Sequence, residues 1–157
     1  MKYKFKLLFF LLFTNFIYCQ TTFTAKVVGI KDGDTVVVLD SLNNQTTLRL
    51  AEIDTPEKSQ PFGTKAKQFT SDQIYLKKIK YVVTDVDRYD RSIAMIYYVT
   101  DNKYLSAEII KAGMGWHYKR YSTSKELAEF EISARKNKIG LWVDSNPVEP
   151  SEWRNKQ

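Results

Sequence analysis

Cysteine and histidine are scarce in this chain of 157 residues, which contains only Cys19 and His117 of these two types. A single cysteine cannot form an internal disulfide, and a zinc site needs a cluster of cysteine or histidine ligands. Apolar runs are also too short to span a bilayer comfortably, and there is no internal repeat. These absences exclude a disulfide-stapled scaffold, a zinc domain and a repeat array.

The first 19 residues have the pattern of a secretory signal peptide. Three lysines fall within the first six positions, and an apolar run follows from Leu7 to Tyr18. A basic start followed by a short apolar segment is typical of such peptides. We therefore expect residues 1–19 to be a signal peptide and the protein to be secreted or periplasmic. The alternatives are an N-terminal membrane anchor and a lipid anchor on Cys19.

Composition and charge describe the rest of the chain. Hydrophobic residues make up 43% of the sequence, which is enough for a core, and the length suits one domain. The formal net charge is +6, and removing residues 1–19 takes away three lysines and no acid, which leaves +3. This mildly basic chain permits a polyanionic partner. We expect the domain over residues 22–143 and a loose polar tail over residues 144–157.

Alternating and helical patterns predict the elements of the domain. The pair Asp32-Gly33 is a hairpin signal, and a capping box at Thr123 and Glu126 marks the start of the last helix. The predicted strands cover residues 23–30, 35–39, 46–53, 78–86 and 92–99, and the predicted helices cover residues 62–76, 106–112 and a segment from 126. Five strands with a helix between the third and fourth indicate an α+β, β-rich fold, a five-stranded OB-fold barrel with three helices.

The stretch from Arg49 to Glu57 combines charges that suit phosphate chemistry. Pro56 ends its strand because it lacks an N–H and fixes its own φ. Where the strand stops, the chain presents Asp54, the Thr55 carbonyl and Glu57. In such an arrangement the arginine neutralises a phosphate, one carboxylate holds a metal, and the other takes a proton from water. The alternative is an ordinary turn or helix start capped by Asp54 or Thr55.

A second carboxylate is expected beside Asp54. Asp34 lies at the far end of the Asp-Gly turn, just before the second predicted strand, and Asp54 lies where the third predicted strand stops. Because neighbouring strands of a meander are antiparallel, these two strand ends meet. Two carboxylates and the Thr55 carbonyl form a site made only of oxygen ligands, which suits Ca²⁺ or Mg²⁺.

The segment Asp87–Arg91 lies between the fourth and fifth predicted strands and supplies a second guanidinium. If Arg91 faces Arg49, two fixed cations and a metal offset the charge that builds on a phosphoryl group during hydrolysis. The alternative is a hairpin turn with surface arginines.

Aromatic residues alternate with basic ones from Trp116 to Tyr121. Bases stack on aromatic rings while cations follow the phosphate backbone, so Trp116, Tyr118 and Tyr121 form a candidate nucleotide platform. A core position is the alternative for Trp116. For His117 we expect a structural or surface role and not acid–base chemistry.

Five short motifs follow one another along the chain. They are Asp32-Gly33-Asp34-Thr35, Arg49 through Glu57, Asp87-Arg88-Tyr89-Asp90-Arg91, Gly113 through Tyr118, and Gly140-Leu141-Trp142. Each motif alone is weak. In this order, and over roughly residues 22–143, they resemble the staphylococcal nuclease, or thermonuclease, family.

The resemblance implies a secreted, Ca²⁺-dependent phosphodiesterase on an OB-fold. Such an enzyme cuts DNA and RNA, in single-stranded or locally open form, and leaves 3′-phosphate ends. By motif, Asp34 and Asp54 correspond to the calcium carboxylates, and Thr55 corresponds to a ligand through its carbonyl. We expect a monomer with no stable protein partner.

The remaining roles are carried over in the same way. Glu57 corresponds to the general base, Arg49 and Arg91 to the arginines that bind the scissile phosphate, and Tyr89 to a residue that contacts a substrate phosphate. The family usually has glycine before the second arginine, where this chain has Asp90. The Asp90 carboxylate either weakens the phosphate site or points to solvent.

A non-catalytic nucleic-acid-binding OB-fold module is the alternative function. Such modules exist among relatives of this fold, and they tend to lose the acids and arginines of the site. This chain retains both, which favours catalysis.

Overall fold

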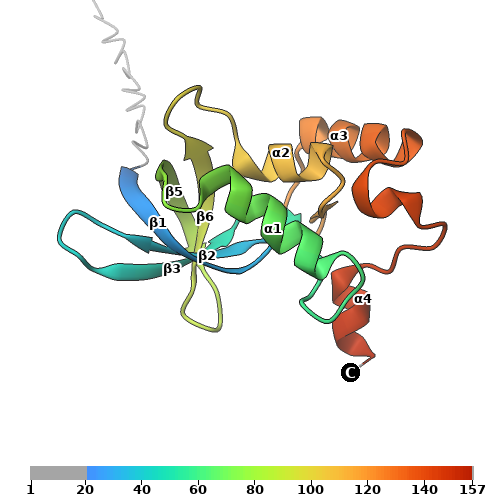
Figure 1. The fold of residues 1–157 in the computed structure, drawn as a ribbon, viewed down its shortest axis with the longest axis horizontal. Coiled ribbons are helices and arrows are strands. Elements are labelled where there is room, and N and C mark those ends of the chain that lie inside the picture. Colours follow the sequence, from blue (N-terminus) through green and yellow to red (C-terminus); the bar gives the residue numbers. More distant parts are fainter. Residues whose placement is uncertain (1–20, 157) are drawn as a thin grey trace, which may run out of the picture.

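A computed structural model describes residues 21–156, so the expected signal peptide and Cys19 lie outside the described residues. Five strands close into a barrel in the order β1 (Thr22–Asp32), β2 (Thr35–Leu39), β3 (Gln45–Leu50), β6 (Ser92–Tyr98) and β5 (Lys78–Val86) (Figure 1). Strands β3 and β6 are parallel, and the other neighbours are antiparallel. The predicted five-stranded barrel of the OB type, in a mixed α+β fold, is confirmed.

Alternating side chains build the core of the barrel. In β2, Val36 and Val38 are buried, whereas Val37 between them is only half-buried, as the two-residue period of a strand requires. Leu48 and Leu50 of β3 belong to the same core. Full burial of one such aliphatic side chain stabilises the fold by about 1.5–3 kcal/mol.

Three helices occur where the sequence predicts them. Helix α1 (Gly63–Ile74) packs on β1, α2 (Leu105–Lys111) packs on β6, and α3 (Lys125–Lys136) packs on α2. Figure 1 shows α1 running diagonally across the centre of the molecule, with α2 and α3 side by side above it. The cap of α3 is Ser124 and not the predicted Thr123, because the Ser124 hydroxyl accepts the Leu127 N–H at 3.3 Å. Within residues 21–156, no helix has the length and apolarity needed to cross a membrane.

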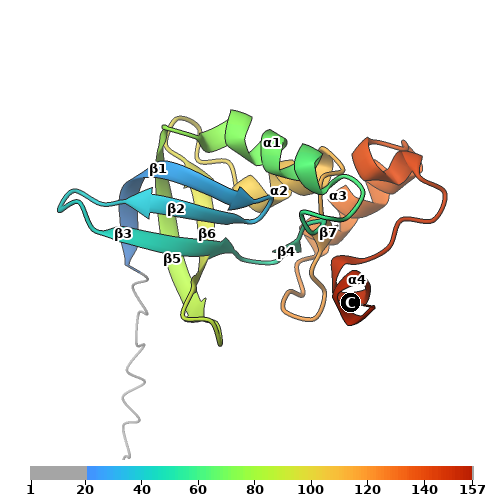
Figure 2. The ribbon, with the colours of Figure 1, turned by 60° about the horizontal axis from the view of Figure 1, so that its bottom comes forward.

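The C-terminal segment is more ordered than the loose tail expected from the sequence. It contains helix α4 (Pro150–Asn155), which follows a 3₁₀ turn η1 (Gly140–Val143). Residues 21–156 therefore contain four α-helices, one more than predicted. Pro150 stands at the start of α4, where a backbone N–H would have no partner within the helix, so its absence costs no hydrogen bond. Figures 1 and 2 both show α4 set apart from α2 and α3.

The strand predicted over residues 46–53 is interrupted at Glu52. Strand β3 ends at Leu50, Glu52 has a φ of 65°, and β4 (Ile53–Asp54) pairs with β7 (Trp116–His117) in a separate small sheet. A continuous strand over residues 46–53 would place Glu52 on the same face as Leu50, but the left-handed φ of Glu52 breaks that alternation. Leu50 packs in the core, whereas Glu52 accepts a hydrogen bond from Ser122. The chain leaves the barrel at this bend.

Candidate active site

A cavity of about 750 Å³ opens beside the barrel. Its walls come from the β1–β2 turn, the chain between β3 and Glu57, the hairpin between β5 and β6, the loop after β7, and α4. Figure 2 shows this hairpin, this loop and α4 projecting on the same side of the molecule. The predicted site residues that line the cavity are Asp34, Arg49, Asp54, Thr55, Glu57, Tyr89, Arg91, Tyr118 and Tyr121. Trp116 is the predicted site residue that is missing from the lining.

Arg49 joins the two carboxylates that the sequence predicts to converge. Its Nη1 lies 2.6 Å from Asp34 Oδ2, an ion pair without hydrogen-bond geometry, and its Nη2 donates to Asp54 Oδ1 at 3.0 Å. The register explains the first contact, since Thr35 of β2 pairs with Arg49 of β3. Asp34 and Asp54 are both buried, so their negative charges depend on this guanidinium for compensation.

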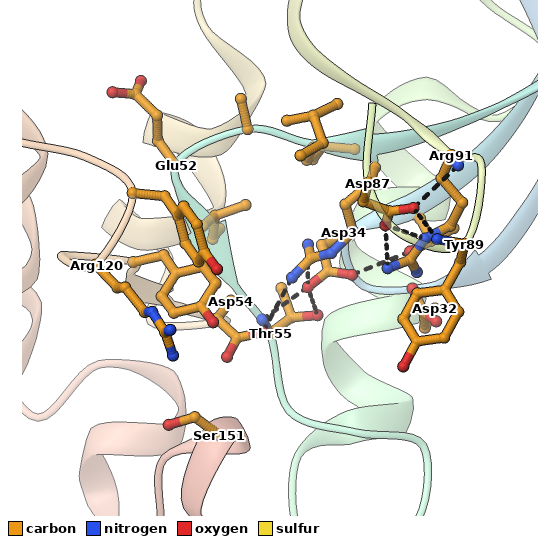
Figure 3. A pocket seen from close by; sticks show the side chains of 18 of the residues that line it. Asp32, Asp34, Glu52, Asp54, Thr55, Asp87, Tyr89, Arg91, Arg120 and Ser151 are labelled. Atoms are coloured by element: carbon orange, nitrogen blue, oxygen red, sulfur yellow. Dashed lines mark hydrogen bonds and ion pairs between the residues drawn. The ribbon is translucent and has the colours of Figure 1, made fainter. Parts of the chain in front are cut away.

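Thr55 and Gly33 fix the position of the Asp34 carboxylate. Thr55 donates both its N–H and its hydroxyl to Asp34 Oδ2, each at 2.9 Å (Figure 3). A Cβ on Gly33 would lie 2.7 Å from the Thr55 hydroxyl oxygen, so this close approach requires glycine. Helix α1 holds the same turn, because the Thr70 hydroxyl donates to the Gly33 carbonyl at 2.6 Å. The Asp34 carboxylate is therefore held in one orientation.

A further guanidinium, from Arg154 of α4, enters the site from the end of the chain. Its Nη2 donates to Asp54 Oδ2 at 2.9 Å, and its Nη1 donates to Glu57 Oε1 at 2.5 Å. Asp54 therefore lies between Arg49 and Arg154. Sequence patterns did not single out Arg154. Pro150 could have suggested a helix start, but no local signal shows where that helix docks.

Burial raises the pKa of two carboxyls in the site. Burial and the neighbouring Asp34 charge raise the pKa of Asp32 to about 6. Burial also raises the pKa of Asp54, against the opposing effects of Arg154 and Arg49. Asp32, which the sequence placed only in a hairpin turn, keeps its Oδ1 buried with no hydrogen-bond partner. Carboxylates outnumber guanidiniums here, so an added cation would lower the electrostatic free energy of the site.

Arg91 is held within its own hairpin. Its Nε donates to Asp87 Oδ2 at 2.7 Å, and its Nη2 lies 2.7 Å from the same oxygen. Slight burial acts to raise the pKa of Asp87, but the hydrogen bonds from Arg91 outweigh it and lower that pKa. The Tyr89 ring centroid lies 5.4 Å from Arg91 Cζ, within the range of a cation–π contact. Figure 3 shows Tyr89 and Arg91 together on one wall of the cavity.

Asp90 does not face the cavity. It is exposed, and it is absent from the residues that line the site. Its φ is 59°, a left-handed value that glycine adopts freely and that aspartate tolerates better than most residues. Of the two interpretations offered for Asp90, the solvent-facing one is correct. The carboxylate that contacts Arg91 belongs to Asp87.

The candidate nucleotide platform contains two aromatic residues and not three. The rings of Tyr118 and Tyr121 meet edge to face at 4.9 Å, and Tyr121 is 65% exposed. Trp116 is only 5% exposed, and its ring packs against Trp142 at 5.1 Å. The core alternative for Trp116 is therefore correct, and the interpretation as a stacking residue is not.

Comparison with known proteins gives the family. Residues 47–144 match the family described as "Staphylococcal nuclease homologue". An "Uncharacterized endonuclease" of Haemophilus influenzae is 44% identical over 134 residues, which cover 85% of this chain and 74% of that protein. The chain belongs to the staphylococcal nuclease family. A "Micrococcal nuclease" of Shigella flexneri is 37% identical to this nuclease over 142 residues, which cover 84% of the chain and 80% of that protein. The protein is therefore a nuclease, a hydrolase of phosphodiester bonds.

His117 of this nuclease does not line the cavity, and its ring contacts Ser122. The Ser122 hydroxyl donates to Glu52 Oε1 at 2.7 Å, so the Ser122 oxygen can only accept from His117 Nε2, which lies 2.8 Å away. Burial lowers the pKa of His117, which favours the neutral ring. The ring therefore serves to connect β7 with the loop that carries Tyr121.

Replacing the imidazole tests this assignment. We expect His117→Gln to keep cleavage within a few-fold of the parent nuclease, while it lowers the free energy of unfolding by about 1–3 kcal/mol through the lost buried contact. Turnover and the midpoint of thermal unfolding are measured on the same samples. A loss of turnover beyond a hundredfold in a variant that unfolds at the parental temperature would contradict the structural role.

Proposed function

We propose that this nuclease is calcium-dependent, is exported, and hydrolyses single-stranded or locally open DNA and RNA to leave 3′-phosphate ends. The observation that carries the proposal is the contact of Arg49 with both Asp34 and Asp54, in a cavity that also holds Glu57. This arrangement combines a fixed cation, oxygen ligands for a metal, and a carboxylate that can accept a proton.

A calcium ion would be held by Asp34 and Asp54 together with the Thr55 carbonyl. The residues fit a hard cation, because every donor is oxygen and the unpaired Asp32 oxygen lies beside Asp34. Within residues 21–156, no three His, Cys, Asp or Glu side chains lie close enough together to hold a metal ion by themselves. Backbone and water oxygens would therefore complete the coordination shell of the calcium ion. When bound, the ion supplies positive charge beside the phosphoryl group.

Glu57 is the proposed general base, and Arg49 and Arg91 are the proposed phosphate-binding residues. Glu57 takes a proton from water, whose oxygen bonds to phosphorus. The bond between phosphorus and the 5′ oxygen breaks, and that oxygen takes up a proton from solvent, so the phosphate stays on the 3′ side. The guanidiniums offset charge on the phosphoryl group, and a pKa above about 12 makes them poor proton donors. To bind the phosphate, Arg91 would give up one of its two contacts with Asp87 Oδ2.

Three exposed or half-exposed tyrosines are the proposed substrate contacts. Tyr89, Tyr118 and Tyr121 line the cavity from two different walls. Base stacking on such rings needs unpaired bases, which supports single-stranded or locally open substrates. One chain supplies every residue named in the mechanism, and we propose a monomer that needs no stable protein partner.

The export part of the proposal rests on the sequence of residues 1–19. After their removal the chain has no cysteine, so the domain over residues 22–143 cannot form a disulfide after export. The polar residues from 144 onward follow this domain and supply α4.

Digestion of single-stranded DNA in calcium, in magnesium and with a chelator tests the proposal. We expect cleavage in calcium and loss of cleavage with the chelator, because the phosphoryl charge then lacks its metal. Cleavage in magnesium as well would keep the nuclease and refute strict calcium dependence. Binding of DNA without cleavage in every condition would support the non-catalytic OB-fold module instead.

A further inference from the structure

Helix α4 reaches the active site from beyond the region that defines the family. The family match ends at residue 144, and α4 begins at Pro150. Even so, Ser151, Arg154 and Asn155 line the same cavity as Asp34 and Arg49. Figure 3 shows Ser151 on the helix that lies below Asp54. The site is therefore closed on one side by a segment that the family domain itself does not include.

Arg154 binds the carboxylates on which the proposed mechanism depends. Both of its terminal nitrogens donate to Asp54, at 2.9 Å and 3.3 Å, and Nη1 also donates to Glu57. A guanidinium bound to both oxygens of one carboxylate occupies the directions from which that carboxylate would bind a metal ion. The same contact engages one oxygen of Glu57, which the mechanism needs as a proton acceptor.

Helix α4 is held by Trp153, whose buried ring nitrogen has no hydrogen-bond partner, by the Arg154 ion pairs and by the segment before the helix. Gln60 accepts the Glu57 N–H through Oε1 and donates through Nε2 to the Val148 carbonyl at 2.6 Å, which ties the segment before α4 to the turn after Glu57. Pro150 is buried, but α4 has only six residues, and the Arg154 side chain is 41% exposed. A short helix with few buried groups has a small free energy of local opening.

We propose that Arg154 is an internal cation that competes with the divalent metal for Asp54 and Glu57, so that α4 is a latch released when the metal binds. This inference rests on the metal site of the proposed function. Like charges at the same carboxylate repel, so a divalent ion at Asp54 lowers the affinity of that carboxylate for the guanidinium. By linkage, the guanidinium lowers the affinity for the ion by the same factor.

Calcium affinity without substrate tests the competition. Isothermal titration of the full chain is compared with Arg154→Gln, and we expect Arg154→Gln to bind calcium roughly tenfold more tightly, since one nearby positive charge is gone. Arg154→Lys keeps the charge but loses the two-pronged contact, so its affinity should fall between the two. The matched control is Lys156→Gln, which removes the same charge from the end of α4, where the Lys156 ammonium pairs with Glu152 at 2.9 Å. Its affinity should equal that of the parent.

The outcomes separate this inference from the proposed function. Equal or weaker calcium binding by Arg154→Gln, with the parent still binding calcium, overturns the competition and leaves the metal site intact. Calcium binding by neither protein overturns the metal site and the latch together. Equal tightening in Lys156→Gln and Arg154→Gln would assign the effect to net charge and overturn the specific contact.

Hydrogen exchange on the unaltered protein gives a second measurement that does not depend on a variant. Calcium should speed amide exchange in residues 151–156 while it slows exchange around Asp34 and Thr55. Faster exchange in α4 is a result that ordinary stabilisation by a ligand does not produce, because binding slows exchange wherever it only tightens the fold. Slower exchange in α4 on adding calcium would overturn the latch.

Discussion

Glu57→Gln is expected to lower the turnover of single-stranded DNA by about 10²- to 10⁴-fold, the range that a positioned general base contributes. Glutamine keeps the size of the side chain but cannot take a proton from water. The side chain of Glu57 is 36% exposed, so the substitution leaves no buried charge without a partner, and the fold should persist. The measurement is kcat at saturating calcium, with thermal unfolding recorded on the same preparation.

Glu52→Gln is the matched control for this prediction. Glu52 and Glu57 line the same cavity, and each carries one carboxylate. The Glu52 Oε1 accepts the Ser122 hydroxyl, and a glutamine amide oxygen accepts the same bond. We therefore expect Glu52→Gln to cleave within a few-fold of the parent. An equal loss in both variants would assign the effect to the negative charge of the cavity, and near-normal cleavage by Glu57→Gln would remove Glu57 as the base.

The barrel could be predicted because its strands follow a period of two that the sequence displays. Val36 and Val38 alternate with Val37, and the Asp32-Gly33 pair ends β1 where the hairpin needs it. The bend at Glu52 could not be predicted, because a left-handed φ at a residue other than glycine leaves no trace in an alternating pattern. The cap of α3 could not be predicted either, because threonine and serine both favour the cap position and Thr123 and Ser124 are adjacent in the sequence.

The site was predictable as far as it depends on neighbouring strands. Asp34 and Asp54 lie at strand ends that the meander brings together, and the β2–β3 register places Arg49 beside Asp34, from where it also contacts Asp54. Arg154 depends instead on the docking of a polar segment about a hundred positions away, through a contact of Gln60 with a backbone carbonyl. A backbone carbonyl has no sequence signature, so this docking could not be predicted. The sequence also could not decide between core and surface for Trp116, since both environments favour a large aromatic ring.

Arg49→Lys is expected to lower turnover on the order of 10²- to 10³-fold, comparable to the loss of one preorganised charge stabiliser. The Arg49 side chain is only 14% exposed and reaches Asp34 and Asp54 with separate nitrogens. The single ammonium of lysine cannot reach Asp34 and Asp54 and also contact a phosphate, whereas the planar guanidinium has separate nitrogens for each. Because Asp34 or Asp54 then loses a partner while buried, the free energy of unfolding should also fall by about 1–3 kcal/mol. Turnover, calcium affinity and unfolding are measured separately, since the three effects have different origins.

Arg135→Lys separates the effect on catalysis from the effect on stability. Arg135 donates through Nε and Nη2 to the buried carboxylate of Glu131, and its guanidinium lies 3.8 Å from the Trp142 ring centroid, outside the lining of the cavity. The same substitution there loses a two-pronged contact with a buried acid, so stability should fall while turnover stays within a few-fold of the parent. If Arg49→Lys also cleaves within a few-fold of the parent, Arg49 only neutralises the buried acids. If its turnover falls far below that of Arg135→Lys at equal stability, the guanidinium acts on the phosphate itself.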